Sequence, residues 1–217
     1  MKKIVLVLVA VFFVFTLSSC KDDDDVEIID IPEEGIIYKH NLPYYEYMSL
    51  GNPVVTITIK DIGVITIELF PSLAPNTVNN LINYIENDVY TDVVFHRVIA
   101  DFMIQAGELA STPCPISGEF SENGFENDLL HYRGVLSTAR TEDEDSATSQ
   151  FFIVHQDSFT LNGYYAAFGG VVSGFNVLDY IANVYTDSYD RPYIDIVIES
   201  MSVELNGYVA SAPICAD

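Results

Sequence analysis

Short runs in which apolar and polar residues alternate begin at residue 54, and they predict β-strands. The runs at 54–60 and 64–70 flank the turn Asp61-Ile62-Gly63, so together they predict a β-hairpin. Further strand-like runs lie at residues 93–99, 102–105, 134–138, 150–155, 166–172 and 193–205. So many short strands predict a mainly β domain.

Two segments between the strands have helical spacing instead. Residues 76–87 place their apolar side chains on one stripe, with Asn76 or Thr77 as the cap of the first turn. Residues 177–184 predict a second, short helix. Hairpin turns, many strands and two helices predict a closed antiparallel barrel that the helices cap, and we place this domain at residues 51–217.

The N-terminus has the parts of a bacterial export signal. Met1-Lys2-Lys3 is a short basic start, and residues 4–17 are almost wholly apolar but too short for a bilayer core of about 30 Å. Leu17-Ser18-Ser19-Cys20 follows and resembles the lipobox of bacterial lipoproteins, in which the cysteine is lipidated. The resemblance implies a signal peptide at residues 1–19 and attachment to a lipid bilayer through Cys20. The alternative is an ordinary signal peptide followed by a chance cysteine.

A charged segment and then an aromatic one follow the cysteine. Lys21-Asp22-Asp23-Asp24-Asp25 predicts a solvated tether, and it resembles the acidic export signal of lipoproteins displayed on some Gram-negative bacteria. We therefore expect an outer-membrane lipid anchor with the domain exposed at the cell surface, with a periplasm-facing anchor as the alternative. The tether covers residues 20–50. Its tyrosines between Tyr38 and Tyr47 either pack on the domain or bind a partner.

The net charge of −23 excludes some classes of partner. Removal of the leader takes Lys2 and Lys3 with it and leaves a charge of about −25, which repels nucleic acid and anionic headgroups. Cys114 and Cys215 allow one disulfide in an oxidising compartment, and their spacing leaves this pairing open. The histidines and cysteines have no metal-ligand spacing, so we expect no metal site.

The stretch from Phe95 to Gly107 contains the candidate residues for a functional site. It places a permanent cation, Arg97, and an amide, Gln105, among large apolar side chains such as Phe102 and Met103. A charge with so many apolar neighbours is either satisfied by a partner or used in a site. Taken alone, the apolar side chains fit a core and Arg97 fits a surface ion pair.

Four blocks of sequence place this stretch in a wider pattern. They are the hairpin with Pro71-Ser72-Leu73-Ala74-Pro75-Asn76-Thr77-Val78-Asn79-Asn80, the runs Phe95–Ile99 and Phe102–Gln105, residues 134–140 with 146–153, and Ala167-Phe168-Gly169-Gly170-Val171-Val172. In this order the blocks resemble the cyclophilin family of peptidyl-prolyl cis-trans isomerases in its bacterial form. The resemblance covers residues 53–205 and is specific because all four blocks occur in order.

The resemblance implies a closed eight-stranded antiparallel barrel with a helix over each end and an active groove on its outside. It implies that Arg97 is the catalytic cation and that Gln105 positions the substrate backbone. The residues implied for substrate binding are Phe102, Met103, Ala139, Phe152, Phe159, Leu161 and Tyr165. The implied partners are proline-containing polypeptides, with a cyclosporin-type ligand as a further candidate, and we expect a monomer.

The residue types suit this reaction. Resonance holds a peptide bond planar with a rotation barrier of about 18–20 kcal/mol, and the two forms of an Xaa-Pro bond differ by only about 0.5–1 kcal/mol. Twisting localises a lone pair on the prolyl nitrogen, so an arginine aimed at this atom binds the twisted form best. No nucleophile, metal or cofactor is needed, and we expect none. The alternatives are a non-catalytic module that binds proline-containing segments and a structural component that uses Tyr38–Tyr47.

The chain departs from the family pattern at the edges of the predicted site. Ala100-Asp101 stands where Pro-Gly is common, and Ala106 replaces a glycine. Thr160 stands where an aromatic residue is usual, with Phe159 one position earlier. The acidic run at residues 142–145 borders the predicted groove, where it would favour basic peptides.

Overall fold

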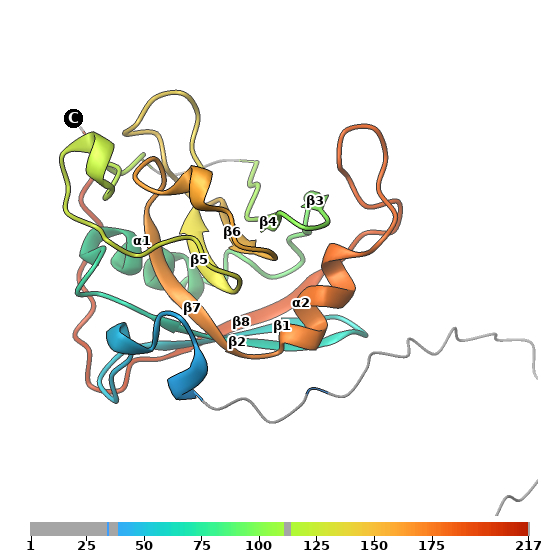
Figure 1. The fold of residues 1–217 in the computed structure, drawn as a ribbon, viewed down its shortest axis with the longest axis horizontal. Coiled ribbons are helices and arrows are strands. Elements are labelled where there is room, and N and C mark those ends of the chain that lie inside the picture. Colours follow the sequence, from blue (N-terminus) through green and yellow to red (C-terminus); the bar gives the residue numbers. More distant parts are fainter. Residues whose placement is uncertain (1–33, 35–38, 111–113, 217) are drawn as a thin grey trace, which may run out of the picture.

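The computed structural model of the chain describes Glu34 and residues 39–110 and 114–216 (Figure 1). The predicted signal peptide, Cys20 and the acidic run after it lie outside the described residues. Within the described residues, no helix is long and apolar enough to cross a membrane. The elements are β1 (Val54–Ile59), β2 (Gly63–Leu69), α1 (Pro75–Glu86), β3 (Arg97–Ile99), β4 (Met103–Ala106), β5 (Val135–Thr138), β6 (Phe151–Val154), β7 (Ala167–Ser173), α2 (Phe175–Ala182) and β8 (Ile198–Glu204), with 3₁₀ turns η1 (Lys39–Asn41), η2 (Tyr45–Tyr47), η3 (Ser121–Asn123) and η4 (Phe159–Leu161).

The eight strands form one antiparallel sheet in the order β3-β4-β6-β5-β7-β2-β1-β8. The predicted mainly β fold with two helices is confirmed, but the sheet is an open half-barrel and the predicted closure is not confirmed. β3 and β8 share no ladder, and the residues before them meet in a single bridge, Val94 with Val197. The outer edge of β3 pairs with a loop instead, since Val98 N donates to Asp190 O at 2.8 Å.

Alternation along the strands separates two apolar groups of residues. The inner core includes Val98, Ile104, Ile153 and Leu136, which lie opposite one another across β3, β4, β6 and β5. A second group, here called the outer cluster, lies on the other face of these strands. Its buried members are Tyr44, Phe70, Met103, Leu129, Val135, Phe152, Val154 and Ala167.

The two helices lie on opposite sides of the strands (Figure 1), and a distant carboxylate caps each one. α1 begins at Pro75, one or two residues before the predicted start. The Glu119 carboxylate accepts hydrogen bonds from Asn76 N and Thr77 N at 3.0 and 2.7 Å. The predicted cap at Asn76 or Thr77 is therefore wrong, because both residues lie inside the helix and donate to Glu119. Glu34 accepts hydrogen bonds from Gly174 N and Phe175 N at the start of α2.

The described part of the predicted tether, Glu34 and residues 39–50, contacts the domain. Tyr44 is fully buried against Phe70, and its hydroxyl donates to Val171 O at 2.6 Å. A Cβ atom at Gly170 would overlap the Tyr44 ring, so a glycine is required where β7 passes beneath it. This answers the question that the sequence left open for the tyrosines near Tyr44: this tyrosine is part of the fold.

A disulfide between Cys114 and Cys215, with Cα atoms 5.5 Å apart, fastens the C-terminal tail. The tail also contacts α1, where Asn76 bonds to the backbone of Ile214 and Asn79 to Tyr208. The pairing that spacing could not decide is therefore present, and it ties the chain end to the loop before η3.

Candidate active site

The candidate catalytic residues lie in one row across the outer face of the sheet. Arg97 on β3 is opposite Gln105 on β4, and Gln105 is opposite Phe152 on β6. Phe152 is in turn opposite Ser137 on β5. Directly opposite residues of antiparallel strands point to the same face, so the strand register brings the cation, the amide and an aromatic ring together.

Arg97 is held at the edge of this row by an ion pair. Its Nε atom lies 3.3 Å from Asp190 Oδ2, and both side chains are less than half exposed. Asp190 adopts a left-handed backbone conformation with φ of 64°, and its carbonyl accepts the hydrogen bond from Val98 N. The loop that carries Asp190 therefore contacts both the backbone of β3 and the guanidinium of Arg97.

Gln105 is oriented by a second amide. Its Nε2 atom donates to Gln150 Oε1 at 2.7 Å. Gln150 directly precedes β6, and its carbonyl accepts a hydrogen bond from Ala139 N. With Nε2 engaged in this way, the Oε1 atom of Gln105 is the group free to accept a hydrogen bond from a ligand.

Most of the residues predicted to bind substrate belong to the outer cluster. Met103 and Phe152 are buried within it, while the partly buried residues packed against them include Phe102, Ala139, Leu161 and Tyr165. The Tyr165 ring meets the Phe152 ring edge-on at 5.8 Å. Phe159 is the exception, because half of its surface is exposed and its ring contacts Tyr132 at 5.2 Å.

His131 contacts the row through Phe152. It is fully buried and its ring stacks on Phe152 at 6.0 Å. Its nitrogens lie 3.0 Å from Asn162 Oδ1 and 3.1 Å from Ser137 Oγ. Burial lowers the pKa of His131 to about 4, so the imidazole is neutral at pH 7.

Comparison with known proteins decides the family. The family model for "Cyclophilin type peptidyl-prolyl cis-trans isomerase/CLD" matches residues 54–203. The chain belongs to the cyclophilin family. It is a cyclophilin-type peptidyl-prolyl cis-trans isomerase, as the resemblance in the sequence predicted.

Individual cyclophilins resemble this one over most of its domain. The peptidyl-prolyl cis-trans isomerase of Acinetobacter baylyi is 41% identical, over 65% of this chain and 78% of its own length. The isomerase cyp18 of Streptomyces antibioticus is 42% identical, over 65% and 93%. The crystal structure of a Cryptosporidium parvum cyclophilin in the presence of the dipeptide Ala-Pro matches with a TM-score of 0.64 and 27% identity, over 70% and 98%.

The unusual Ala100-Asp101 pair of this cyclophilin forms the turn between β3 and β4. Phe102 N donates to Ile99 O at 3.1 Å, and Asp101, the third residue of the turn, has φ of 59°. Glycine is usual at this position of such a turn, and aspartate is among the few residues that tolerate it. The substitution thus leaves the hairpin that presents Arg97 and Gln105 intact.

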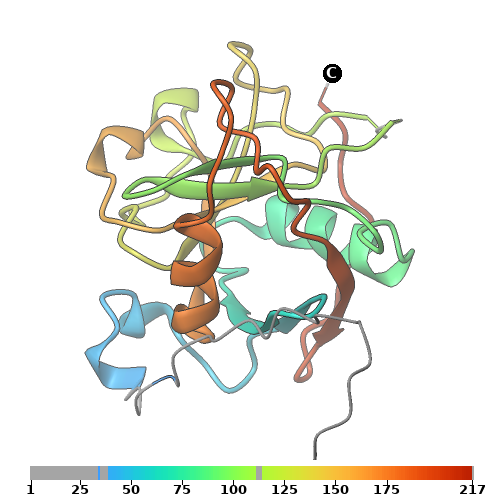
Figure 2. The same ribbon diagram turned by 90° about the vertical axis from the view of Figure 1, so that its right-hand side faces the viewer.

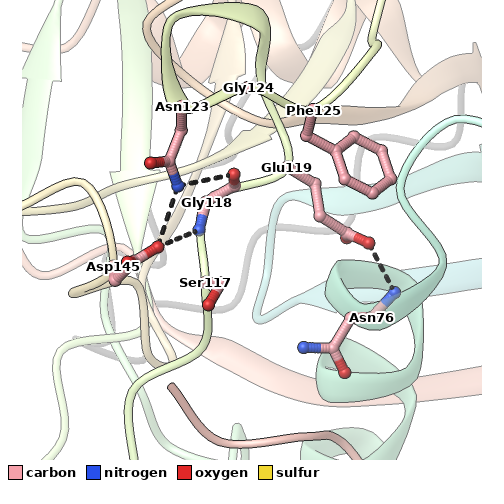
Figure 3. Close-up of a pocket in the computed structure, with 8 residues that line it drawn as sticks. All are labelled: Asn76, Ser117, Gly118, Glu119, Asn123, Gly124, Phe125 and Asp145. Atoms are coloured by element: carbon pink, nitrogen blue, oxygen red, sulfur yellow. Dashed lines mark hydrogen bonds between the residues drawn. The ribbon is translucent and has the colours of Figure 1, made fainter. Parts of the chain in front are cut away.

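A separate polar cleft of about 330 Å³ lies beside the start of α1 (Figure 3). Asp145, the last residue of the acidic run, accepts hydrogen bonds from Gly118 N and Asn123 Nδ2 at 3.0 and 2.8 Å. Both hydrogen bonds lower the pKa of Asp145, and the bond from Asn123 has the larger effect. The acidic run therefore borders this cleft, and its predicted preference for basic peptides stays a prediction.

Sequence reasoning missed the residues that hold the row in place. Asp190 and Gln150 orient Arg97 and Gln105, and His131 supports Phe152. Asp190 is 93 positions from its partner, and no local signal links the two. Gln150 stands directly before the Phe151-Phe152 pair that carries part of the resemblance. Of the three residues, it is the one that the sequence could have indicated.

Proposed function

We propose that this cyclophilin accelerates Xaa-Pro rotation in unfolded or flexible proteins, with Arg97 and Gln105 as its catalytic residues, while lipid-anchored outside the cytoplasm. The row of Arg97, Gln105 and Phe152 on one face is the observation that carries the catalytic part. The lipobox-like sequence ending at Cys20 supports the anchored part.

Arg97 supplies the donor that favours the twisted bond. A guanidinium is a rigid cation with five N–H donors, and Asp190 engages the Nε atom of Arg97. The two terminal amino groups are then the donors that reach the prolyl nitrogen. This nitrogen accepts a hydrogen bond well only when the bond is twisted, so the contact lowers the rotation barrier.

Gln105 and the outer cluster hold the substrate while the bond turns. The Oε1 atom of Gln105 accepts a backbone N–H of the peptide, and Gln150 fixes the direction of the amide. The proline ring packs on the apolar side chains around Phe152 and Met103. Apolar contact excludes water from the hydrogen bond of Arg97 and makes it stronger.

The catalytic part is tested on a short Xaa-Pro peptide and on a protein whose refolding is limited by proline isomerisation. We expect the wild-type domain to accelerate exchange in both, measured by NMR exchange and by fluorescence. Binding of either substrate without acceleration would contradict the proposal and would leave a module that only binds proline-containing segments.

The anchored part is tested with the full chain in a Gram-negative host fed a labelled fatty acid. We expect label on the wild type and on Cys215→Ser, and none on Cys20→Ser. Degradation by protease added to intact cells would support surface display, and protection would support an anchor that faces the periplasm. Label on Cys20→Ser would overturn the anchor.

A further inference from the structure

The connection between α2 and β8 forms a hairpin that exposes large apolar side chains. We call residues 185–194 the aromatic hairpin. Tyr185, Tyr189, Tyr193 and Ile194 are 88%, 84%, 72% and 77% exposed. Isolated exposed apolar residues are ordinary, but a group of them within ten residues marks an interaction surface.

The aromatic hairpin is well built, so this exposure does not come from a loose loop. Tyr193 N donates to Tyr185 O at 3.1 Å, and Thr186 and Pro192 form a β-bridge. At the tip, Asp187 Oδ1 accepts hydrogen bonds from Tyr189 N and Arg191 N at 2.8 and 3.0 Å. Figures 1 and 2 show the hairpin projecting from the body of the domain. The rings are therefore presented on a pre-organised support, which lowers the entropic cost of binding.

The aromatic hairpin adjoins the row of Arg97, Gln105 and Phe152 on the outer face, here called the catalytic row. Asp190, near its tip, bonds to the backbone of β3 and to Arg97. The row thus runs from Phe152 through Gln105 and Arg97 to the hairpin. A polypeptide whose proline lay at Arg97 would therefore have the aromatic hairpin next to it, on the far side of Asp190 from Gln105.

The charges around the rings narrow the choice of partner. Three carboxylates, Asp187, Asp190 and Asp195, face two arginines: Arg191 pairs with Asp195 at 3.6 Å, and Arg97 pairs with Asp190 at 3.3 Å. The remaining excess of negative charge disfavours anionic headgroups and a second copy of the same surface as partners. Extended apolar segments of unfolded protein, uncharged or basic, fit the hairpin best. Tyrosines suit such varied partners because each ring offers a large contact area at low entropic cost.

We propose that the aromatic hairpin is a second binding surface of this isomerase, which holds the unfolded polypeptide that flanks the reacting proline. The proposal rests on the proposed function, since it assigns the client that the catalytic row would act on. It predicts that the hairpin contributes to the recognition of long, unfolded chains and far less to that of short peptides, whose contacts end within the row.

The test compares Tyr185→Ser/Tyr189→Ser/Tyr193→Ser with the wild type and with Tyr45→Ser/Leu50→Ser/Val209→Ser, which removes exposed apolar side chains elsewhere. We expect the hairpin variant to lose at least about five-fold in kcat/KM for an unfolded protein, through KM, as for the loss of one or more binding hot spots. Its kcat/KM for a four-residue Xaa-Pro peptide should change far less. The control variant should match the wild type on both substrates, and all three proteins should keep the same thermal midpoint.

Three outcomes would overturn the proposal. Equal losses on both substrates would mean that the hairpin acts only by holding Arg97, and no loss on either would mean that it binds no client. A wild-type dimer that the hairpin variant dissolves, seen by sedimentation, would make a second copy the occupant. If the wild type is inactive on the short peptide, the proposed function fails instead, and binding of the unfolded protein to the two variants still tests the hairpin.

Discussion

The two faces of the strands β3, β4, β6 and β5 are built from alternate residues of the same segments, yet they differ in chemistry. The inner row of Val98, Ile104, Ile153 and Leu136 is wholly apolar and buried. The outer row carries a guanidinium, an amide, an aromatic ring and a hydroxyl. One register thus fixes both a core and a candidate site, and a shift by one residue would exchange the two faces.

The difference teaches which partners each face needs. The apolar side chains of the inner row are buried by other apolar side chains of the same sheet and of the two helices. The outer row depends on residues outside its own strands: Asp190, in a loop far along the chain, pairs with Arg97, and Gln150, directly before β6, bonds to Gln105. We therefore expect inner substitutions to lower stability, and outer polar substitutions to lower activity while stability is kept.

The largest expected effect is on the inner face. Ile104→Ala should lower the free energy of unfolding by about 4 kcal/mol, because a fully buried side chain leaves a cavity. Activity per folded molecule should remain that of the wild type, measured by denaturant titration and peptide exchange on one sample. A loss of activity without a loss of stability would break the distinction between the faces.

His131, which stacks on Phe152 of the outer cluster, makes the stability of the domain depend on pH. Its folded pKa of about 4 is below the ordinary value, so unfolding takes up a proton as the pH falls from about 6.5 toward 4. The stability from neutral His131 is present above this window and lost within it. Between pH 7 and pH 5 we expect a loss of about 2 kcal/mol from this residue. The difference in the free energy of unfolding between these pH values should shrink by that amount in His131→Asn, and an unchanged difference would contradict the assignment.

Gln105 tests the amide of the outer row. Gln105→Ala should lower kcat/KM for a short Xaa-Pro peptide about ten-fold, because one substrate hydrogen bond is lost. Gln156→Ala removes an exposed glutamine just after β6 and serves as the matched control. Equal activity of the two variants would show that Gln105 is only part of the scaffold.

The smallest effect separates structure from function within the outer cluster. Tyr44→Phe removes the hydroxyl that donates to Val171 O and should cost about 1 kcal/mol of stability. Its activity should match the wild type, because Tyr44 packs on Phe70 and Gly170 and bonds to Val171, none of which belongs to the row. Reduced activity with unchanged stability would place the segment around Tyr44 in the site.

Local patterns predicted much of this fold, and long-range contacts were out of their reach. Alternation located the β1–β2 hairpin and the strands around Gln105, because a strand with one buried face has apolar residues at every second position. The Cys114–Cys215 pair, the cap from Glu119 and the burial of Tyr44 depend on residues brought together only by the fold. Closure of the barrel was expected from the family, but here the hairpin carrying Asp190 covers the edge of β3.

The sequence likewise predicted some residues of the candidate site and missed others. The resemblance selected Arg97, Gln105 and Phe152, which the register places in one row. It also selected Phe159, whose ring the fold places on Tyr132 and outside the outer cluster. A displaced aromatic residue next to Thr160 was the signal that this position would differ.

The central claim is that Arg97 on the outer face lowers the rotation barrier, and one comparison tests it most directly. Exchange of a short Xaa-Pro peptide is measured by NMR with the wild type, Arg97→Ala and Arg133→Lys. Arg133 pairs with Asp179 on α2, so its variant controls for loss of a structural arginine. We predict a loss of about 100-fold for Arg97→Ala, with stability unchanged, and full activity for Arg133→Lys. Full activity of a folded Arg97→Ala protein would contradict the account.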